Sequence, residues 1–419
     1  MSLARAGRIA AAYLDARLAE RSLRDRAALE RRQARLWRRL APALARTPAL
    51  ASLAGRPLED FPVREPAELR GDLSAWNSLG LDTASILAAA QAAEDGGEIA
   101  LPGGAQAGFS TGSEGARGVF LTTPAERDHY IGTLLGKLIA PTRLLAPIRA
   151  ALILRANNRL YEDIGGAGAA FAFIGLDETP QAQAAALRAF APTHLVAPPH
   201  VLAGLARLSE TDGWADRLEG LYYGAEPMGE REGEVLARAF GRRPAPLYQA
   251  TEGFLGAPCR LGILHLNEEN LIVERDPLPG GTRFRPIVTD LRRTAQPMVR
   301  VRLDDLIEPT PPCPCGSPRL AIRPVEGRVG DIWRAGEMMI FPREVEAALE
   351  AALPPLAPWR AEASPGEVRV LVEEIAHLPP ARAAIEALLA AQGVDWPVAA
   401  EALAEVETRP KRRRVRWRA

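Results

Sequence analysis

The middle of the chain alternates short apolar runs with amphipathic segments. Between residues 148 and 240, apolar runs such as IRAALILR and AAFAFIGL are separated by stretches with helical spacing, such as QAQAAALRAF. Short apolar runs that alternate with helices predict a largely parallel β-sheet covered by helices on both faces. Because ligands of such sheets bind beyond the carboxyl ends of the strands, a binding site is expected where these runs end.

The regions on either side of this pattern have other periodicities. Residues from about 4 to 44 have helical spacing with dense Arg and Glu, which predicts one or two helices packed on the main body. The runs LIVER and RFRPIVTDL, which begin at Leu271, indicate antiparallel β structure. Beyond about residue 332, the order helix, strand, helix and apolar stretch is typical of a compact α+β unit.

These patterns predict an α/β protein with two domains. The first is a large N-terminal domain, residues 1–330, with mainly parallel sheets flanked by helices and an additional β subdomain. The second is a small α+β C-terminal domain, residues 331–419. A chain of 419 residues is long enough to form both.

Charge and cysteine content bear on the protein's partners and on its cellular location. Lys and Arg together number 52, as do Asp and Glu, so the formal net charge of zero gives no general attraction to nucleic acid. Three cysteines, no charged-then-apolar leader and no apolar run of about 18 residues predict a cytoplasmic protein without disulfides or a membrane span. The oligomeric state stays open between monomer and homodimer.

A loop rich in Ser, Thr and Gly precedes the apolar run at residues 119–122. Such loops wrap backbone N–H groups around phosphate oxygens, which predicts a triphosphate clamp. A surface turn has the same composition, so the loop alone does not decide between the two. The candidate phosphate-binding residues are Ser110, Thr111, Gly112, Ser113 and Gly115.

Two later segments, LYYGAEPM and LYQATEGF, each end an apolar run in small and polar residues. Such ends can receive an adenine ring and a metal-bound phosphate, although polar capping of a strand explains them as well. Thr251 and Glu252 pair a hydroxyl with a carboxylate, the hard oxygen donors that Mg²⁺ prefers. The other candidate nucleotide-binding residues here are Gly224, Ala225, Glu226, Pro227, Tyr248 and Gln249.

A fourth segment contains VRVRLDDLIE and, further on, EGRVGDIW. Asp305 follows a strand and is placed to accept hydrogen bonds from vicinal ribose hydroxyls, and Arg328 can support the same nucleotide. Together and in this order, the four segments resemble the adenylate-forming acyl/aryl-CoA ligase superfamily, most closely its phenylacetate–CoA ligase-like branch. The resemblance covers about residues 75 to 415.

The resemblance implies a reaction and a movement. ATP and a carboxylic acid would give an acyl-adenylate and pyrophosphate, with Mg²⁺ at Glu252 and a small mobile C-terminal domain that turns about Asp331. The acyl group would then pass to a thiol, that of coenzyme A or of a carrier-protein pantetheine. Lys411 in RPKRRRVRW matches the catalytic lysine, and Arg328 matches the arginine before the hinge.

The chain departs from the family pattern at several of these positions. Gln249, Asp304 and Pro410 stand where glycine is usual, and Ala116-Arg117 replaces the more usual Pro or Lys in the phosphate loop. A basic tail is also more often a solvated face, which keeps the catalytic role of Lys411 open. A protein that binds nucleotide without catalysis, stabilised by zinc, is the alternative that these departures leave.

The three cysteines and one histidine form a further pattern. Cys259 and His265 follow Glu252, while Cys313 and Cys315 lie between the ribose aspartate and the hinge. Three thiolates and an imidazole make one tetrahedral set, which predicts a structural Zn²⁺ without a catalytic role. The alternative is that these cysteines are small apolar side chains in the core.

The identity of the acid is the least determined part. RANNRLYEDIGGAG follows a strand end and offers Asn157, Asn158 and Tyr161 as lining groups, and its glycines leave space for a ring or chain. An Asn-rich turn explains the segment equally well. An aryl or acyl carboxylate is implied by the resemblance alone. Nucleic-acid binding is the weakest alternative, because the charge balance is neutral and Trp417 is the only aromatic residue within the basic run.

Overall fold

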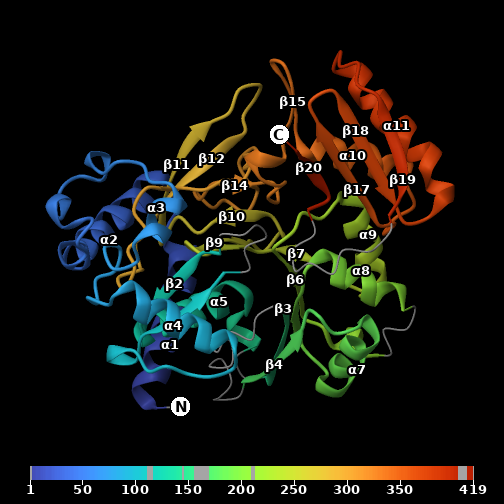
Figure 1. Cartoon of the computed structure of the whole chain (residues 1–419). Helices are drawn as coiled ribbons and strands as arrows, with labels where there is room; N and C mark the ends of the chain where they lie inside the picture. Colours follow the sequence, from blue (N-terminus) through green and yellow to red (C-terminus); the bar gives the residue numbers. More distant parts are fainter. Residues whose placement is uncertain are drawn as a thin grey trace.

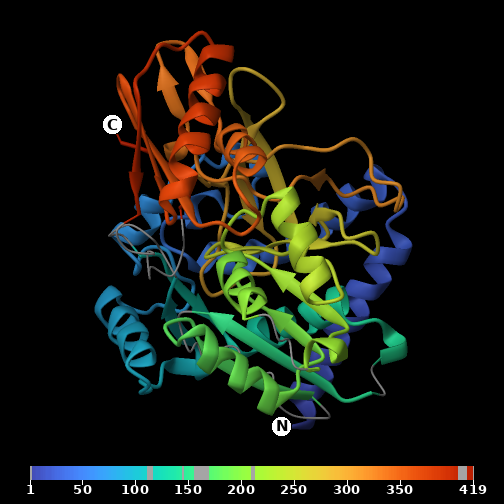
Figure 2. The same ribbon diagram turned by 90° about the vertical axis from the view of Figure 1, so that its right-hand side faces the viewer.

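The computed structural model describes residues 2–110, 117–143, 146–154, 169–208, 213–403 and 413–418. It confirms the α/β fold class, with a large N-terminal and a small C-terminal domain (Figures 1 and 2). The boundary at residues 330 and 331 and the mobility of the small domain stay predictions. Among the described residues, no helix is both long and apolar enough to cross a membrane.

A five-stranded parallel sheet forms the centre of the large domain. Its order is β4-β3-β5-β6-β7, and all neighbouring strands are parallel, as the alternating pattern predicts for the sheet type but not for the order. Helices pack on it and bury Leu187, Leu202 and Leu236. The strands are β3 (Ile148–Leu154), β4 (Ala169–Gly175), β5 (His194–Val196), β6 (Gly220–Tyr223) and β7 (Ala245–Pro246), and the helices are α7 (Pro180–Phe190), α8 (Pro199–Arg207) and α9 (Glu230–Ala239).

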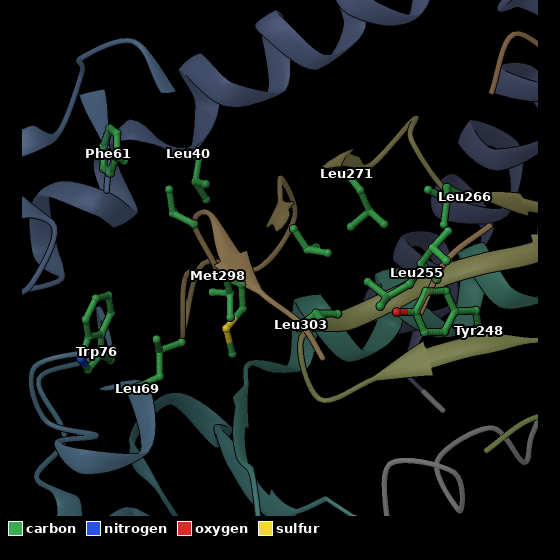
Figure 3. Packing of buried hydrophobic residues seen from close by; sticks show 14 of the residues in the cluster. Leu40, Phe61, Leu69, Trp76, Tyr248, Leu255, Leu266, Leu271, Met298 and Leu303 are labelled. Carbon is green, nitrogen blue, oxygen red and sulfur yellow. The ribbon is translucent and has the colours of Figure 1, made fainter. Parts of the chain in front are cut away.

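The β subdomain consists of two antiparallel sheets that share a core with the second helix of the chain (Figure 3). Leu40, Phe61 and Trp76 pack toward Leu255 and Met298. One sheet has β8 (Tyr248–Ala250), β9 (Gly253–Pro258), β10 (Leu264–Leu266) and β14 (Ala321–Ile322); the other has β11 (Leu271–Pro277), β12 (Phe284–Asp290) and β13 (Val301–Arg302).

The N-terminal pattern forms two helices, α1 (Leu3–Ser22) and α2 (Arg26–Arg46), whose first turns are capped by Ser2 and Asp25. Helix α1 packs closely on α5 (Pro124–Leu138). Gly132 makes this approach possible, because a Cβ there would lie 2.3 Å from the carbonyl oxygen of Ile9. Ahead of α5 lie α3 (Pro66–Gly71), α4 (Thr83–Glu94) and a hairpin of β1 (Gln106–Phe109) and β2 (Val119–Thr122).

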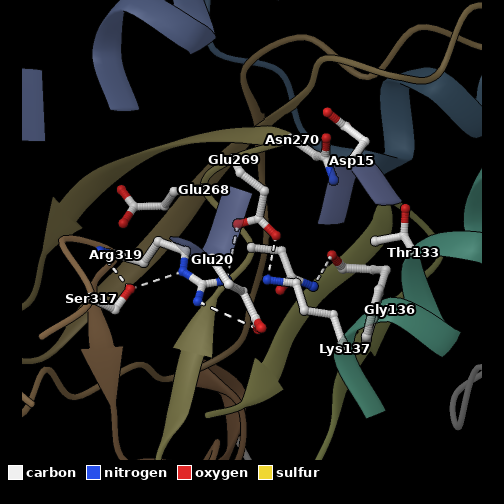
Figure 4. A network of polar contacts seen from close by, with 12 residues as sticks. Asp15, Glu20, Thr133, Gly136, Lys137, Glu268, Glu269, Asn270, Ser317 and Arg319 are labelled. Carbon is white, nitrogen blue, oxygen red and sulfur yellow. Dashed lines mark hydrogen bonds and ion pairs between the residues drawn. The ribbon is translucent and has the colours of Figure 1, made fainter. Parts of the chain in front are cut away.

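A buried ion network joins the N-terminal helices to the β subdomain (Figure 4). Lys137 contacts Glu269, and both side chains are almost fully buried. Arg319 lies 3.3 Å from Glu269 and 3.8 Å from Glu20. Burial alone would raise the pKa of Glu269, but Lys137 and Arg319 outweigh it and lower the pKa to about 2.

The small domain has its own core, in which Trp333, Val345, Val370 and Ile385 are fully buried. A hairpin of β15 (Trp333–Ala335) and β16 (Met338–Ile340) leads into a four-stranded sheet with the order β19-β18-β17-β20. The strands are β17 (Trp359–Ser364), β18 (Glu367–Val372), β19 (Val398–Ala402) and β20 (Val415–Trp417), and the helices are α10 (Pro342–Ala352) and α11 (Leu378–Ala391).

Candidate active site

A cavity of about 690 Å³ lies between the parallel sheet, the β8–β9 hairpin and the small domain. Residues from each of the four sequence segments line it, and so does Arg413 at the start of the last described segment. The lining residues that the sequence predicts are Ser110, Gly224, Ala225, Glu226, Pro227, Tyr248, Gln249, Thr251, Glu252, Asp305, Arg328 and Asp331.

The described ends of the predicted phosphate loop are closed by hydrogen bonds. Ser110 N–H donates to the Gly118 carbonyl at 2.7 Å, and Gly118 N–H donates to Ser110 Oγ at 2.9 Å. Thr251 is adjacent, since a Cβ at Gly118 would lie 3.0 Å from its Oγ1. The remaining loop residues, Thr111, Gly112, Ser113 and Gly115, lie outside the described residues.

Arg117, one of the departures in this loop, pairs with a carboxylate. Its two terminal nitrogens lie 2.7 and 2.6 Å from the Glu94 oxygens, and its guanidinium stacks 4.6 Å from the centre of the Phe109 ring. A bidentate ion pair of this kind fixes the direction of an arginine. The charge of Arg117 is therefore already matched by a carboxylate of α4.

Thr251 and Glu252 form the turn between β8 and β9, an antiparallel hairpin. The sequence predicts only a strand end here, so the hairpin is new information. Arg293 supports the turn by donating to the Thr251 carbonyl and, at 2.9 Å, to Gln296 Oε1. Burial raises the pKa of Glu252, and the nearby charge of Asp305 raises it further. A cation beside Glu252 would oppose both effects.

Asp305 and Arg328 are brought together by an isolated antiparallel β-bridge between them. The Tyr248 hydroxyl donates to Asp305 Oδ2 at 2.7 Å and so orients the carboxylate. Burial raises the pKa of Tyr248 well above its usual range, which keeps this donor protonated.

The turn after β6 has an unusual backbone. Ala225 has a φ of 71°, in the left-handed region that non-glycine residues rarely adopt. At the next position, the Glu226 carboxylate lies 2.8 and 2.9 Å from His200 Nδ1, and both side chains are largely buried. Sequence reasoning missed His200, because a histidine at the start of an apolar helix gives no signal of its partner.

The acid-binding residues predicted from the sequence, Asn158 and Tyr161, lie outside the described residues, as does Asn157. Two described aromatic side chains, Tyr130 of α5 and Phe254 of β9, line the cavity of about 690 Å³. The Tyr130 hydroxyl of α5 donates to Gln249 Oε1 at 2.7 Å, and the Tyr130 ring packs edge-on against Phe254 at 5.9 Å between ring centres. Tyr130 was missed because its helical spacing predicts packing alone.

The predicted hinge residue, Asp331, ends a 3₁₀ turn over Val329–Asp331. Its carboxylate accepts from the Arg328 backbone N–H at 3.0 Å and from Arg413 Nε at 2.9 Å. Arg413 and Val415 both line the cavity. Lys411 lies outside the described residues, two positions before Arg413 in the sequence.

The four predicted zinc ligands gather in one place, with their ligand atoms all within 4.8 Å of one another. Cys259 Sγ lies 3.9 Å from Cys313 Sγ, and Cys315 Sγ lies 3.5 Å from His265 Nε2. A tetrahedral Zn²⁺ with Zn–S of about 2.3 Å and Zn–N of about 2.0 Å separates its ligands by roughly 3.5–3.8 Å. His265 Nδ1 faces the Arg319 carbonyl at 3.1 Å, which leaves Nε2 for a metal.

Solved structures with a similar architecture include CoA ligases. No protein-family profile and no curated protein sequence matches the chain. It superimposes on 2-hydroxyisobutyryl-CoA ligase in the postadenylation state with a TM-score of 0.70 and 18% identity, over 94% of this chain and 90% of that one. The chain has the adenylate-forming ligase fold. The phenylacetate–CoA ligase-like branch stays a prediction.

Two further structures share this adenylate-forming ligase fold. A benzoate CoA ligase from Burkholderia xenovorans has a TM-score of 0.52 and 16% identity, over 70% of this chain and 65% of that one. An amide bond synthetase from Marinactinospora thermotolerans has a TM-score of 0.54 and 18% identity, over 73% and 67%. The 2-hydroxyisobutyryl-CoA ligase in its thioesterification state gives a TM-score of 0.55, below the 0.70 of its postadenylation state.

Proposed function

We propose that this chain activates a carboxylic acid with ATP and then transfers the acyl group to a thiol. The observation that carries the proposal is the single cavity, which is lined by described members of all four motifs. A cavity of about 690 Å³ is within the usual range for small-molecule sites. The thiol is that of coenzyme A or of a carrier-protein pantetheine.

The chemistry balances in two steps. A carboxylate oxygen of the acid attacks the α-phosphorus of ATP, the bond from that phosphorus to the bridging oxygen breaks, and pyrophosphate leaves. A thiol sulfur then attacks the acyl carbon, a C–S bond forms, the thiol proton is lost to solvent and AMP leaves. An aryl or acyl carboxylate fits the aromatic side chains of Tyr130 and Phe254 at the cavity wall.

The nucleotide is assigned to the predicted residues. Asp305, oriented by Tyr248, accepts from the ribose hydroxyls, and Arg328, its partner in the isolated β-bridge, supplies positive charge. Residues 224–227 form the adenine side of the site. Ser110 and the loop that follows it bind phosphate through backbone N–H groups.

Mg²⁺ is assigned to Glu252 and the Thr251 hydroxyl. These are hard oxygen donors, and burial raises the pKa of Glu252, an effect that a bound cation would oppose. When bound, the ion neutralises charge on the phosphate oxygens. Arg293 holds the turn that presents both residues.

Lys411 is assigned the charge that meets the reacting oxygens. Arg413 lines the cavity, and two residues of extended chain span at most about 7 Å. A positioned cation that meets charge developing on the carboxylate and α-phosphate lowers the barrier to adenylation. This is the support for a catalytic role rather than a solvated basic face.

A structural Zn²⁺ is assigned to Cys259, His265, Cys313 and Cys315, because the ligand separations fit a tetrahedral site. Four protein ligands leave no open position, so this zinc takes no part in the reaction. It joins the end of the β9–β10 hairpin, whose first strand follows Glu252, to the loop before β14.

The test is a screen of carboxylic acids for ATP–pyrophosphate exchange, with Mg²⁺ present. At least one aryl or acyl acid should drive exchange, and Mg-ATP should raise the melting temperature. A melting shift without exchange for any acid would favour the alternative, a nucleotide-binding protein that does not catalyse. If neither the melting shift nor pyrophosphate exchange is observed, the nucleotide assignment itself is wrong.

A further inference from the structure

The two domains are joined by an ion pair next to the segment that contains the candidate catalytic lysine. Arg414, just before β20 of the small domain, makes a bidentate pair with Glu232 of α9 in the large domain. The two nitrogen–oxygen distances are 2.9 and 2.8 Å, and the Glu232 side chain is only 4% exposed. The guanidinium also stacks 5.5 Å from the centre of the Trp359 ring.

We infer that Arg414 and Glu232 form a positioning pair, which docks the C-terminal segment on the large domain in the arrangement that adenylation requires. The inference rests on the proposed function for its catalytic meaning. Arg414 is three positions after Lys411, so fixing its guanidinium limits where that lysine can reach. Its neighbour Arg413 is held by Asp331, the predicted hinge, so the same segment has two anchors.

The surroundings of the pair explain why it forms only when the domains meet. Burial opposes the charge of Arg414, but the ion pair and hydrogen bonds with Glu232 outweigh it and raise its pKa, so the arginine stays charged. Glu346 and Glu350 of α10 travel with the small domain, and Glu232 comes from the large one. Docking therefore gives the arginine a bidentate partner that the small domain alone does not supply.

The same contact can be reversed without a large loss. When the domains separate, both charged groups become accessible to water, and hydration replaces much of the lost attraction. Neighbouring contacts are also polar, since Arg231 donates to backbone carbonyls at the end of α10 and Arg207 donates to the Leu356 carbonyl in the loop that follows. An interface of this type suits domains that move relative to each other.

The experiment compares Glu232→Gln with Glu230→Gln. Glu230 is on the same helix and pairs with Arg243 at 2.7 Å, but its side chain is 77% exposed. Residues two positions apart on a helix, such as Glu230 and Glu232, do not share a face. Hydrogen–deuterium exchange, measured without substrates, should increase in Glu232→Gln at the first turn of α9 and at residues 413–418. Exchange in the core strands β17 and β18 should not change, and the Glu230→Gln control should resemble wild type.

Kinetics give the second measurement. With an acid that supports exchange, Glu232→Gln should lower the pyrophosphate-exchange rate by about tenfold or more, as expected when a buried pair is broken. Thioester formation from pre-made adenylate should change little. Arg414→Lys keeps the charge but loses the bidentate contact, so its pyrophosphate-exchange rate should lie between those of wild type and Glu232→Gln. This variant replaces Glu232→Gln if the latter does not fold.

The inference would be overturned in favour of a purely structural ion pair by either of two deuterium-exchange results in Glu232→Gln. One is unchanged exchange at the first turn of α9 and at residues 413–418, and the other is faster exchange throughout β17 and β18. Equal losses in both half-reactions would overturn it as well. The deuterium measurement needs no substrate, so its result stands even if no acid supports adenylation. Failure of the proposed function and failure of the positioning pair are therefore separate outcomes.

Discussion

Single hydrogen bonds decide how several candidate residues face the cavity. Tyr248 fixes the Asp305 carboxylate, Tyr130 fixes the Gln249 amide, and His200 holds Glu226. Tyr130 and His200 belong to none of the sequence motifs. Tyr248 and Asp305 both belong to motifs, but the motifs do not predict that they contact each other. The residue types at the site were therefore predictable, while their partners needed the fold.

Asp305→Ala should weaken ATP binding by roughly tenfold to a hundredfold. The lost acceptor for the ribose hydroxyls costs on the order of 1–3 kcal/mol, which is the free-energy basis of this range. Asp304→Ala is the matched control, because Asp304 is exposed and pairs with Arg285 at 2.6 Å. Calorimetric titration with Mg-ATP measures both. Equal affinities in the two variants would place the ribose contact elsewhere.

Gln249→Gly should widen the range of acids. Gln249 lines the cavity where glycine is usual in the family that the chain resembles, so its side chain takes up space that a larger acid would need. The ratio of kcat/KM for a bulky acid to that for a small acid should rise in this variant. Tyr130→Phe removes only the hydroxyl partner and should shift the ratio much less. A ratio that stays constant in Gln249→Gly would show that the Gln249 side chain does not limit the size of the acid.

At the scale of elements, the hairpin of β8 and β9 shows where sequence reasoning ends. The apolar run before Thr251 predicts a strand that stops there, but hydrophobicity does not show that the chain reverses at once and pairs with itself. Longer elements such as α7 and α10 are predictable from the sequence, because each spans enough residues for its amphipathic period to repeat. Strands such as β7, β13 and β14 have two residues each, too few for any periodicity.

The proposed zinc site lies at the β9–β10 hairpin, and Cys315→Ser tests it. The variant should lose bound zinc and several degrees of melting temperature, because metal-binding free energy is part of the folding free energy. Elemental analysis should find about one zinc per chain in the wild type. Wild-type protein stripped with a chelator should melt as low as the variant. A metal-free wild type of undiminished stability would contradict the zinc assignment.

At the scale of the whole molecule, the two-domain fold was predictable and the contacts between the domains were not. The resemblance supplies a large domain, a small domain and their order, because four motifs mark the first and a compact α+β pattern marks the second. The facing residues, such as Arg414 and Glu232, come from segments that have no motif in common. Only the folded chain brings them together.

Lys411→Ala should separate the two half-reactions. Adenylate formation should slow by about two to three orders of magnitude, the loss typical of one positioned electrostatic stabiliser, while ATP affinity changes little. Thioester formation from pre-made adenylate should be much less affected, because the lysine is expected to have turned away by then. Stopped-flow and pyrophosphate-exchange measurements give both rates. Adenylation at the wild-type rate would contradict a catalytic role for Lys411.

Stability should depend on pH through Glu346. Burial raises its pKa from an ordinary 4.5 to about 8, so the folded protein holds a proton that the unfolded chain releases. Stability from this group is complete below pH 4.5 and is lost as the pH rises through 8. Glu346→Gln should melt like wild type at pH 4.5 and at a higher temperature at pH 9. Glu386→Gln, an exposed change on α11, should show no such trend.

The close packing of α1 on α5 also sets an order in time. About 100 residues separate the end of α1 at Ser22 from the start of α5 at Pro124. At a synthesis rate of about 5–20 residues per second, the face of α1 that contains Ala12 and Ala16 waits about 5–20 s for Gly132 and Gly136 to emerge from the ribosome. During that interval the face of α1 that packs on α5 is uncovered, and a newly made chain can aggregate with other chains through it.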